Sequence, residues 1–269
     1  MRAERPPAVA GLFYPEDPGE LAAQVDGLLD RAGAGPAPKA LVAPHAGYPY
    51  SGPVAASAFA RARPCPWIRR VLLLGPSHRT RLEGLALPAC RAFATPLGRV
   101  DLDPGAPAAL AGLPGLVVSD SPHAREHSLE VQLPFLQRAL GPFLLVPLLV
   151  GRCPPQDLAR VLEALWGGEE TLVVVSTDLS HYLPYQAATA VDEGTCRAVE
   201  GLRPGDIGDE AACGAHPLRG FLRLAAGRRM KVSTLDLRNS GDTAGPRDRV
   251  VGYGAWAFHE REGGAHGRP

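Results

Sequence analysis

The chain has almost no lysine and almost no asparagine. Lysine occurs only at Lys39 and Lys231 and asparagine only at Asn239, so nearly all of the positive charge is arginine. The 28 basic and 28 acidic side chains cancel, and a chain without net charge has no long-range field that would attract nucleic acid or anionic lipid. A nucleic-acid-binding function is therefore not expected. The arginine bias indicates a genome of biased composition, such as that of a thermophile.

Signals for secretion, membrane insertion and disulfide bonding are also missing. No apolar segment follows the charged, proline-containing start at residues 1–7, and no later run reaches the roughly 18 apolar residues that a membrane span needs. The five cysteines are an odd number and include no Cys-x-x-Cys pair, which argues against a disulfide framework or a zinc ribbon. We therefore expect a cytoplasmic protein with reduced cysteines.

Several motifs of nucleotide-binding proteins and hydrolases do not occur. There is no P-loop, no G-x-G-x-x-G after an apolar run, no H-E-x-x-H and no G-x-S-x-G. These motifs form the phosphate cradle, the dinucleotide turn, the zinc peptidase helix and the serine nucleophile elbow. Their absence disfavours nucleotide binding and the common peptidase and esterase mechanisms.

Short apolar runs alternate with amphipathic stretches along the chain. Hydrophobic residues make up 45% and charged residues 21%, which is typical of a folded domain and not of a disordered chain. The alternation predicts an α/β fold whose central, mostly parallel or mixed sheet has helices on both faces. The predicted strands are Ala40–Val42, Val71–Leu74, Leu144–Val150, Leu172–Val175, Val232–Leu237 and Val250–Ala257. The predicted helices are Pro18–Arg31, Pro53–Arg63, Leu129–Leu140, Pro155–Trp166, Tyr185–Glu200 and Pro217–Ala226.

Glycine and proline are distributed between the apolar runs and do not gather in one linker. We therefore expect one domain over residues 1–262, followed by a flexible tail at 263–269. Between Leu85 and Leu102 the pattern breaks into short apolar runs separated by Pro88, Pro96 and Gly98. This segment is predicted to be a small β excursion from the main pattern.

Three histidines occupy the same kind of position. His45 in LVAPHAGY, His78 in LLLGPSH and His181 in VVVSTDLSH each come just after a predicted strand. In open α/β sheets, the loops that leave the carboxyl ends of neighbouring strands converge on one crevice. Imidazole binds Zn, Fe, Cu and Ni, so the three together indicate a metal site. Separate capping or loop roles for the three histidines are the alternative.

A set of imidazoles needs a further, anionic ligand before it favours one metal. Cys213 in AACGAHP stands before a predicted helix, where the pKa of a thiol is expected to be lowered. The alternative is a buried apolar thiol, which is the interpretation that we adopt for Cys65, Cys90, Cys153 and Cys196.

Two further segments carry polar groups near predicted strand ends. In EHSLEVQLPFL, His127 and Glu130 are spaced to share one face of a helix and to contact a substrate or a ligand. The alternative is an exposed helix start whose acids face the positive end of the dipole, as we expect for Glu126. Asp178 precedes His181 by three residues, so it is expected to hydrogen-bond that ring, or to cap a helix. The segment NSGDTAG, residues 239–245, is expected to form a turn or a lid over the crevice.

Seven motifs of the chain, in this order, resemble those of the Memo-like proteins, whose prokaryotic members are called AmmeMemoRadiSam system protein B. The motifs are AGLFYP, APHAGYPYSG, LGPSH, EHSLEVQLPFL, STDLSHY, CGAHP and NSGDTAG. The resemblance runs from about Gly11 to Phe258, which is nearly the whole chain. It implies a single α/β domain similar to that of the class III extradiol ring-cleaving dioxygenases, with non-haem iron at the ends of the sheet strands. The family name also implies an association with radical-SAM system proteins.

Matched motif by motif, the resemblance implies that His45, His78 and Cys213 are metal ligands. His181 then corresponds to the catalytic base of the dioxygenases, and Asp178 and His127 are expected beside it. The dioxygenases have a glutamate as third ligand, whereas this chain has Cys213. Ring cleavage is therefore not carried over, because a thiolate changes both the metal preference and the reactivity.

Three functions are compatible with these residues. The first is a metal-dependent oxidoreductase of unknown substrate, in which the metal is Fe(II) and His181 moves a proton. The second is a non-catalytic module that binds copper or iron, or a peptide. The third is a zinc-dependent hydrolase with His181 as base.

Overall fold

A mixed nine-stranded sheet forms the centre of the fold over residues 3–261, the part of the chain that the computed structural model describes. The strands are β1 (Ala40–Ala43), β2 (Arg70–Pro76), β3 (Leu85–Leu87), β4 (Ala92–Thr95), β5 (Gly98–Asp101), β6 (Leu116–Val118), β7 (Leu144–Val150), β8 (Thr171–Ser176), β9 (His181–Leu183), β10 (Lys231–Asn239) and β11 (Val250–His259). Their order across the sheet is β10-β11-β1-β8-β2-β7-β3-β6, with β9 beside β11, and β4 and β5 form a separate hairpin.

The middle of the sheet is parallel. β1 pairs with β8, β8 with β2, and β2 with β7, all in the same direction. β11 and β3 flank these four strands in the antiparallel direction. The carboxyl ends of β1, β8 and β2 therefore lie next to each other at one edge of the sheet, and the loops that leave them meet there.

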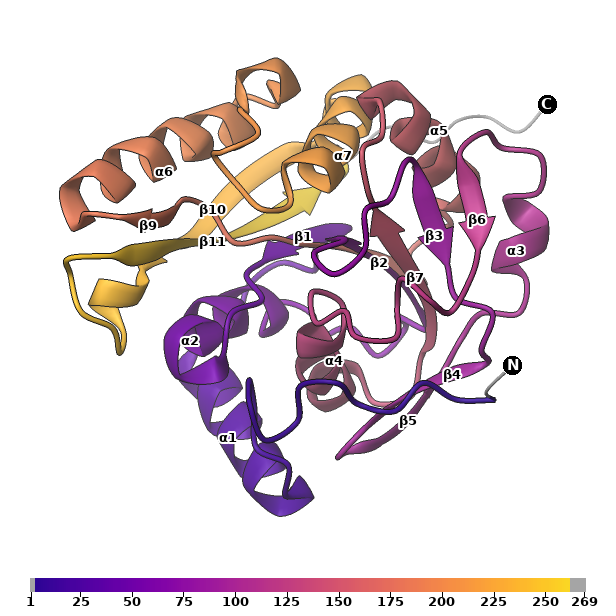
Figure 1. Cartoon of the computed structure of the whole chain (residues 1–269), viewed down its shortest axis with the longest axis horizontal. Coiled ribbons are helices and arrows are strands. Elements are labelled where there is room, and N and C mark those ends of the chain that lie inside the picture. Colours follow the sequence, from indigo (N-terminus) through magenta and orange to yellow (C-terminus); the bar gives the residue numbers. More distant parts are fainter. Residues whose placement is uncertain (1–2, 262–269) are drawn as a thin grey trace.

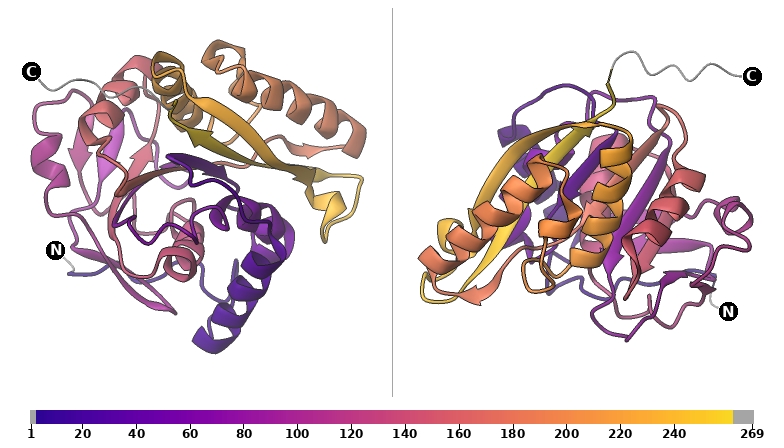
Figure 2. Two further views of the ribbon diagram at one scale, coloured as in Figure 1. Left: turned by 180° about the vertical axis from the view of Figure 1, so that it is seen from behind. Right: turned by 90° about the horizontal axis from the view of Figure 1, so that it is seen from above.

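Helices cover both faces of the sheet, as Figures 1 and 2 show. The helices are α1 (Pro18–Arg31), α2 (Tyr48–Phe59), α3 (Ala106–Ala109), α4 (Leu133–Leu140), α5 (Pro155–Leu165), α6 (Tyr185–Glu200) and α7 (Ala215–Gly227), with short 3-10 turns at Glu130–Gln132, Pro204–Asp206 and Ser240–Asp242. α1, α2 and α4 pack on one face, and α5 and α7 pack on the other. α6 lies against β10 and β11.

The two faces of the sheet explain why the central strands are apolar without interruption. Along β2, Val71 and Leu73 belong to the core beneath α1, α2 and α4. Leu72 and Leu74 belong to the core beneath α5 and α7. A parallel strand that is buried on both faces shows a continuous hydrophobic run and no alternation. The predicted α/β fold with a mixed sheet and helices on both faces is confirmed.

The predicted elements are present, with three differences. The helix predicted at Pro53–Arg63 begins at Tyr48, because Pro49 occupies its first turn and Pro53 is tolerated inside at the cost of one backbone hydrogen bond. The helix predicted at Leu129–Leu140 is divided into the 3-10 turn at Glu130–Gln132 and α4. The β excursion is confirmed as β3, β4 and β5, whereas β6, β9 and α3 have only three or four residues and were not predicted.

Two expectations concern the chain as a whole. The predicted tail, residues 263–269, lies outside the described residues. None of the helices within residues 3–261 is long and apolar enough to cross a membrane.

Candidate metal centre

The loops after β1, β2 and β8 line a cleft of about 790 Å³ at the carboxyl edge of the sheet. His45 stands two residues after β1, His78 two residues after β2, and Asp178 two residues after β8. The walls of the cleft also include His127, His181 and Cys213. Every residue that the sequence assigned to the metal or to catalysis therefore faces one cavity.

His45 is buried, and its hydrogen bonds define which ring nitrogen is free. Its Nδ1 lies 2.8 Å from Oγ of Ser176. That hydroxyl donates its own proton to the carbonyl of Ser128 at 2.6 Å and accepts from Nε2 of Gln132 at 2.7 Å. The same amide nitrogen donates to the carbonyl of Pro44, which fixes the orientation of the amide. Ser176 can therefore only accept from His45, so Nδ1 carries the proton and the lone pair of Nε2 faces the Cys213 sulfur at 3.3 Å.

The surroundings of His45 also keep its ring neutral. Burial, followed by the nearby His78 and His127 rings, holds the pKa of His45 well below its usual value. Its backbone N–H donates to Oδ1 of Asp178 at 2.7 Å, so the loop after β1 is tied to the loop after β8. A neutral imidazole with a free Nε2 is the form that binds metal.

Glu126 anchors the two other imidazoles and is the main site residue that the sequence reading placed wrongly. It was expected at an exposed helix start, but it is only 2% exposed. Its carboxylate lies 3.0 Å from Nδ1 of His78 and 3.2 Å from Nδ1 of His127. It also accepts from the backbone N–H groups of His78, His127 and Ser128. Burial alone would raise the pKa of the Glu126 carboxyl, but the hydrogen bonds from His127 and His78 outweigh it and hold the pKa far below its usual range.

The three imidazoles form one compact group. The rings of His78 and His127 stack with centroids 4.7 Å apart, and the His45 ring lies edge-on to both at 5.2 Å and 5.4 Å. One ligand nitrogen from each ring lies within 4.8 Å of the other two. Since Glu126 occupies Nδ1 of His78 and faces Nδ1 of His127, the free donors are the Nε2 atoms. Three such donors can hold one metal ion.

Glycines allow the loops to approach each other this closely. A Cβ atom at Gly75 in β2 would lie 2.8 Å from Oγ of Ser128, so glycine is needed where the Glu126–Ser128 loop crosses the strand. A Cβ at Gly214 would lie 2.6 Å from the side chain of Thr177, just after β8. The Gly214 N–H instead donates to Oγ1 of Thr177, which holds the Cys213 loop against the sheet.

Cys213 lies beside His45 but outside the group of three imidazoles. Its Sγ is 3.3 Å from Nε2 of His45 and accepts from the N–H of Asp178 at 3.3 Å. Burial, reinforced by the Asp178 carboxylate, raises the pKa of the Cys213 thiol. The pKa of the Cys213 thiol was expected to be lowered, and this expectation is wrong. Desolvation and the Asp178 carboxylate raise the pKa more than the amino end of α7 lowers it. The other four cysteines are buried, as expected.

His181 opens β9, and its Nδ1 donates to the carbonyl of Leu179 at 2.8 Å. This bond occupies Nδ1, and His181 lines the cleft. The hydrogen bond expected from Asp178 to this ring is not formed, because Oδ1 of Asp178 accepts from His45 instead. The next residue, Tyr182, has a φ of 58°, a backbone conformation that costs energy in a residue with a side chain and that is common near functional sites.

Glu130 does not share a face with His127. Glu126 and His127 lie in irregular backbone, and a turn at 128–129 leads into the 3-10 turn at Glu130, so the helical spacing that was assumed does not apply. Glu130 is fully buried and pairs with Arg5 at 2.6 Å, away from the cleft. The segment 239–245 forms the expected turn, and Ser240 and Gly245 contribute to one wall of the cleft.

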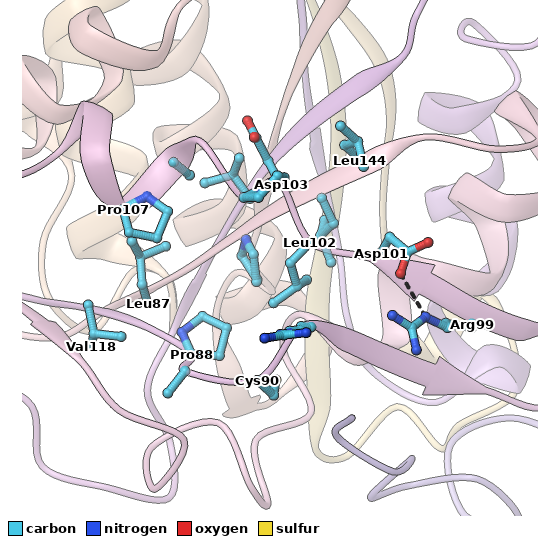
Figure 3. A pocket seen from close by; sticks show the side chains of 17 residues that line it. Leu87, Pro88, Cys90, Arg99, Asp101, Leu102, Asp103, Pro107, Val118 and Leu144 are labelled. Carbon is cyan, nitrogen blue, oxygen red and sulfur yellow. Dashed lines mark hydrogen bonds and ion pairs between the residues drawn. The ribbon is translucent and has the colours of Figure 1, made fainter. Parts of the chain in front are cut away.

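A second large cavity, of about 750 Å³, lies near β3, β6 and the β4–β5 hairpin. Figure 3 shows its apolar walls, including Leu87, Pro107 and Val118, and the ion pair between Arg99 and Asp101 at one end. Among residues 3–261, the one group of three metal-ligating side chains is that of His45, His78 and His127, which do not line this cavity. The candidate chemistry therefore belongs to the histidine cleft.

A family model and the curated relatives of this chain agree on one protein family. A model of the Memo-like proteins matches residues 5–257. A "MEMO1 family protein" of Methanopyrus kandleri is 35% identical and covers 95% of this chain and 99% of its own length. One of Aquifex aeolicus is 36% identical and covers 93% and 97%. A crystal structure of an uncharacterised protein from Escherichia coli K12 is 15% identical, with a TM-score of 0.42 over 71% of this chain and 86% of that protein.

Proposed function

The chain belongs to the Memo-like protein family, and we propose that this member is a non-haem-iron-dependent oxidoreductase acting on a small molecule. Fe(II) is held by His45, His78 and Cys213, with His127 beside them. When bound, the ion supplies redox chemistry and open coordination positions in a cleft of about 790 Å³.

The single observation that carries the proposal is the state of the imidazoles. Each ring directs Nδ1 to a protein oxygen, namely Ser176 Oγ for His45 and the Glu126 carboxylate for His78 and His127. One ligand nitrogen from each ring lies within 4.8 Å of the other two. Imidazoles that are oriented by a protein oxygen at the opposite nitrogen are typical of metal ligands.

The choice of Cys213 as third ligand follows from charge and distance. A divalent ion is bound more tightly when one donor is anionic, and the two nearby carboxylates are occupied by backbone N–H groups and imidazoles. The Cys213 sulfur lies 3.3 Å from Nε2 of His45, a separation that suits two donors of one ion. Its thiol has a raised pKa, so binding of the ion must release a proton.

His181 is the proposed proton-transfer group. Its Nδ1–H bond to Leu179 leaves Nε2 able to take a proton from a substrate in the cleft. Asp178 is a positioning residue in this proposal, because its carboxylate holds the loop of His45 and its backbone N–H holds the sulfur of Cys213.

The proposal is tested by metal analysis of protein purified without oxygen. We expect one iron per chain, and an EPR signal on adding nitric oxide that reports an open coordination position. Cys213→Ser should lose most of the iron, whereas the matched control Cys153→Ser, at another buried cysteine, should lose none. His181→Ala should keep the iron.

Other results would replace parts of the proposal. If His127→Ala loses the metal and Cys213→Ser keeps it, the three imidazoles are the ligand set. Stoichiometric zinc without iron would support a hydrolase, with zinc lowering the pKa of a bound water. Iron that is bound without any response to nitric oxide would support a non-catalytic metal-binding module.

A further inference from the structure

Arg5 is a buried charge that lies outside the cleft and yet is bonded to the loop that carries two of its imidazoles. The side chain is only 5% exposed. Its backbone is fixed against β4, because the N–H of Arg5 donates to the carbonyl of Ala92 at 2.9 Å and its carbonyl accepts from Ala94 at 2.8 Å. The guanidinium also lies over the Phe93 ring, 4.9 Å from its centroid. Arg5 therefore has little freedom to move.

The guanidinium of Arg5 contacts both ends of the loop from His123 to Glu130. Nε donates to the carbonyl of His123 at 2.6 Å, and Nη2 donates to the carbonyl of Glu126 at 2.5 Å. Nη1 pairs with Oε2 of Glu130 at 2.6 Å. The planar fork of arginine can satisfy three such acceptors at once in a fixed geometry.

Glu130 is in turn bonded to the segment that follows Arg5. It accepts from the N–H groups of Ala8 and Val9 and from the hydroxyl of Tyr14 at 2.6 Å. The charge of Arg5 is therefore neutralised locally, and the segment from Arg5 to Tyr14 is tied to the loop beneath the cleft. Buried charges that are paired and fully hydrogen-bonded make such a connection rigid.

Between the two carbonyls that Arg5 holds, the backbone turns so that the Glu126 carboxylate faces His78 and His127. A shift of the Glu126 backbone would move this carboxylate away from Nδ1 of both rings. The orientation of the two imidazoles therefore depends on Arg5 through one intermediate residue.

We propose that Arg5 is a positioning residue of the metal centre, because its guanidinium holds the His123–Glu130 loop in the conformation that lets Glu126 orient His78 and His127. This inference rests on the proposed metal site. It adds a residue that contacts neither metal nor substrate.

The test compares Arg5→Met with Arg5→Lys. Outer-shell partners of ligating histidines typically contribute about 10–100-fold to metal affinity, and Arg5 acts one residue further out. We expect Arg5→Met to weaken the binding of Co(II), measured by competition with a chromophoric chelator, by about 10-fold. Arg5→Lys keeps the charge but cannot span the three acceptors, so its Kd should lie between those of Arg5→Met and wild type.

Two controls separate positioning from loss of stability. Leu162→Ala opens a cavity in the core beneath α5, and it should lower the melting temperature without changing the Kd for Co(II). Arg138→Met removes an ion pair with Asp26 on the surface and should change neither quantity. A purely structural role for Arg5 would not change the ¹⁵N chemical shift of Nδ1 in His78 and His127. We expect this shift to change in Arg5→Met but not in Leu162→Ala.

Unchanged imidazole shifts and an unchanged Kd in both Arg5 variants would overturn the proposal. An equal loss of affinity in Leu162→Ala would overturn it as well. If wild type binds no metal while the shifts still change in Arg5→Lys, the metal function fails and the positioning role of Arg5 stands.

Discussion

The two ends of the parallel strands both contain partly or fully buried ionisable groups, but the hydrogen bonding of these groups differs between the two ends. At the amino end, Lys39 precedes β1, and its Nζ donates to the carbonyls of Trp166, Gly168 and Thr171 at 2.8, 2.6 and 2.8 Å. At the carboxyl end, the imidazoles of His45 and His78 use Nδ1 in bonds to protein oxygens, and Nε2 of His45 faces only the Cys213 sulfur at 3.3 Å.

This difference separates a group with a structural role from the proposed metal ligands. An ammonium has three donors, and Lys39 has matched all three to main-chain oxygens. Burial lowers the pKa of Lys39 to about 8, yet no donor is left for a ligand. At the other end hydrogen bonds at Nδ1 orient the rings of His45 and His78, and one ligand nitrogen from each of these rings and from His127 lies within 4.8 Å of the other two. A perturbed pKa therefore indicates function only where bonding capacity remains.

The largest effect is expected when an imidazole at the carboxyl end of the strands is removed. We expect His45→Ala to bind less than one tenth of the metal that wild type binds, because both ligand sets considered above include His45. Metal content per chain, measured by mass spectrometry, checks this. His259→Ala changes a histidine at the end of β11, outside the cleft, and should keep the full metal content. Equal content in both variants would contradict the assignment.

The next largest effect is expected from Glu126→Gln. The amide keeps the shape but weakens the hydrogen bond to Nδ1 of His78 and the contact with Nδ1 of His127, so metal affinity should fall by about 10–100-fold. Chelator competition measures this Kd. The matched change Glu163→Gln, on α5, removes an ion pair with Arg228 at the surface and should leave the Kd unaltered. A wild-type Kd in Glu126→Gln would show that the carboxylate does not orient the rings of His78 and His127.

The amino end of the strands should respond in stability alone. Lys39→Met leaves three main-chain carbonyls without their donor, which should lower the free energy of unfolding by about 1–2 kcal/mol. Urea denaturation measures this change, and metal content should stay at the wild-type level. A loss of metal in Lys39→Met would show that the two ends of the strands are coupled and would contradict a purely structural role for Lys39.

The smallest effect is a dependence on pH. The folded pKa of Glu126 lies far below its unfolded value near 4.5, so the unfolded chain takes up the proton first as pH falls. The stabilisation from the ionised carboxylate is therefore complete above about pH 5 and declines below about pH 4.5. The difference in free energy of unfolding between wild type and Glu126→Gln should be constant from pH 5 to 7 and shrink towards pH 3. A difference that grows on acidification would reverse the sign of the assigned pKa shift.

The arrangement of the fold was largely predictable, because apolar runs of strand length and amphipathic stretches are local signals. The convergence of His45, His78 and His181 on one cleft was predictable for the same reason, since each comes soon after a strand of the parallel core. The roles of Ser176 and Gln132 were not, because their bonds to His45 and Pro44 join segments far apart in the chain.

Glu126 and Arg5 show where reading the sequence fails. In EHSLE the acids resemble an ordinary helix start, and only the irregular backbone at 126–127 and the approach allowed by Gly75 place Glu126 against His78. Arg5 stands in a short charged segment without periodicity. The hydrogen-bond partners of its guanidinium in the His123–Glu130 loop lie more than 100 residues away, so no local pattern indicates them.

We propose that one ion binds at the carboxyl ends of β1 and β2 through imidazoles and a sulfur. X-ray absorption spectroscopy of the iron-loaded protein identifies the atoms bonded to the ion. We expect scattering from imidazole nitrogens and from one sulfur in the first coordination shell, with the sulfur absent in Cys213→Ser. A spectrum without imidazole scattering, or with the same sulfur contribution in Cys213→Ser, would contradict it.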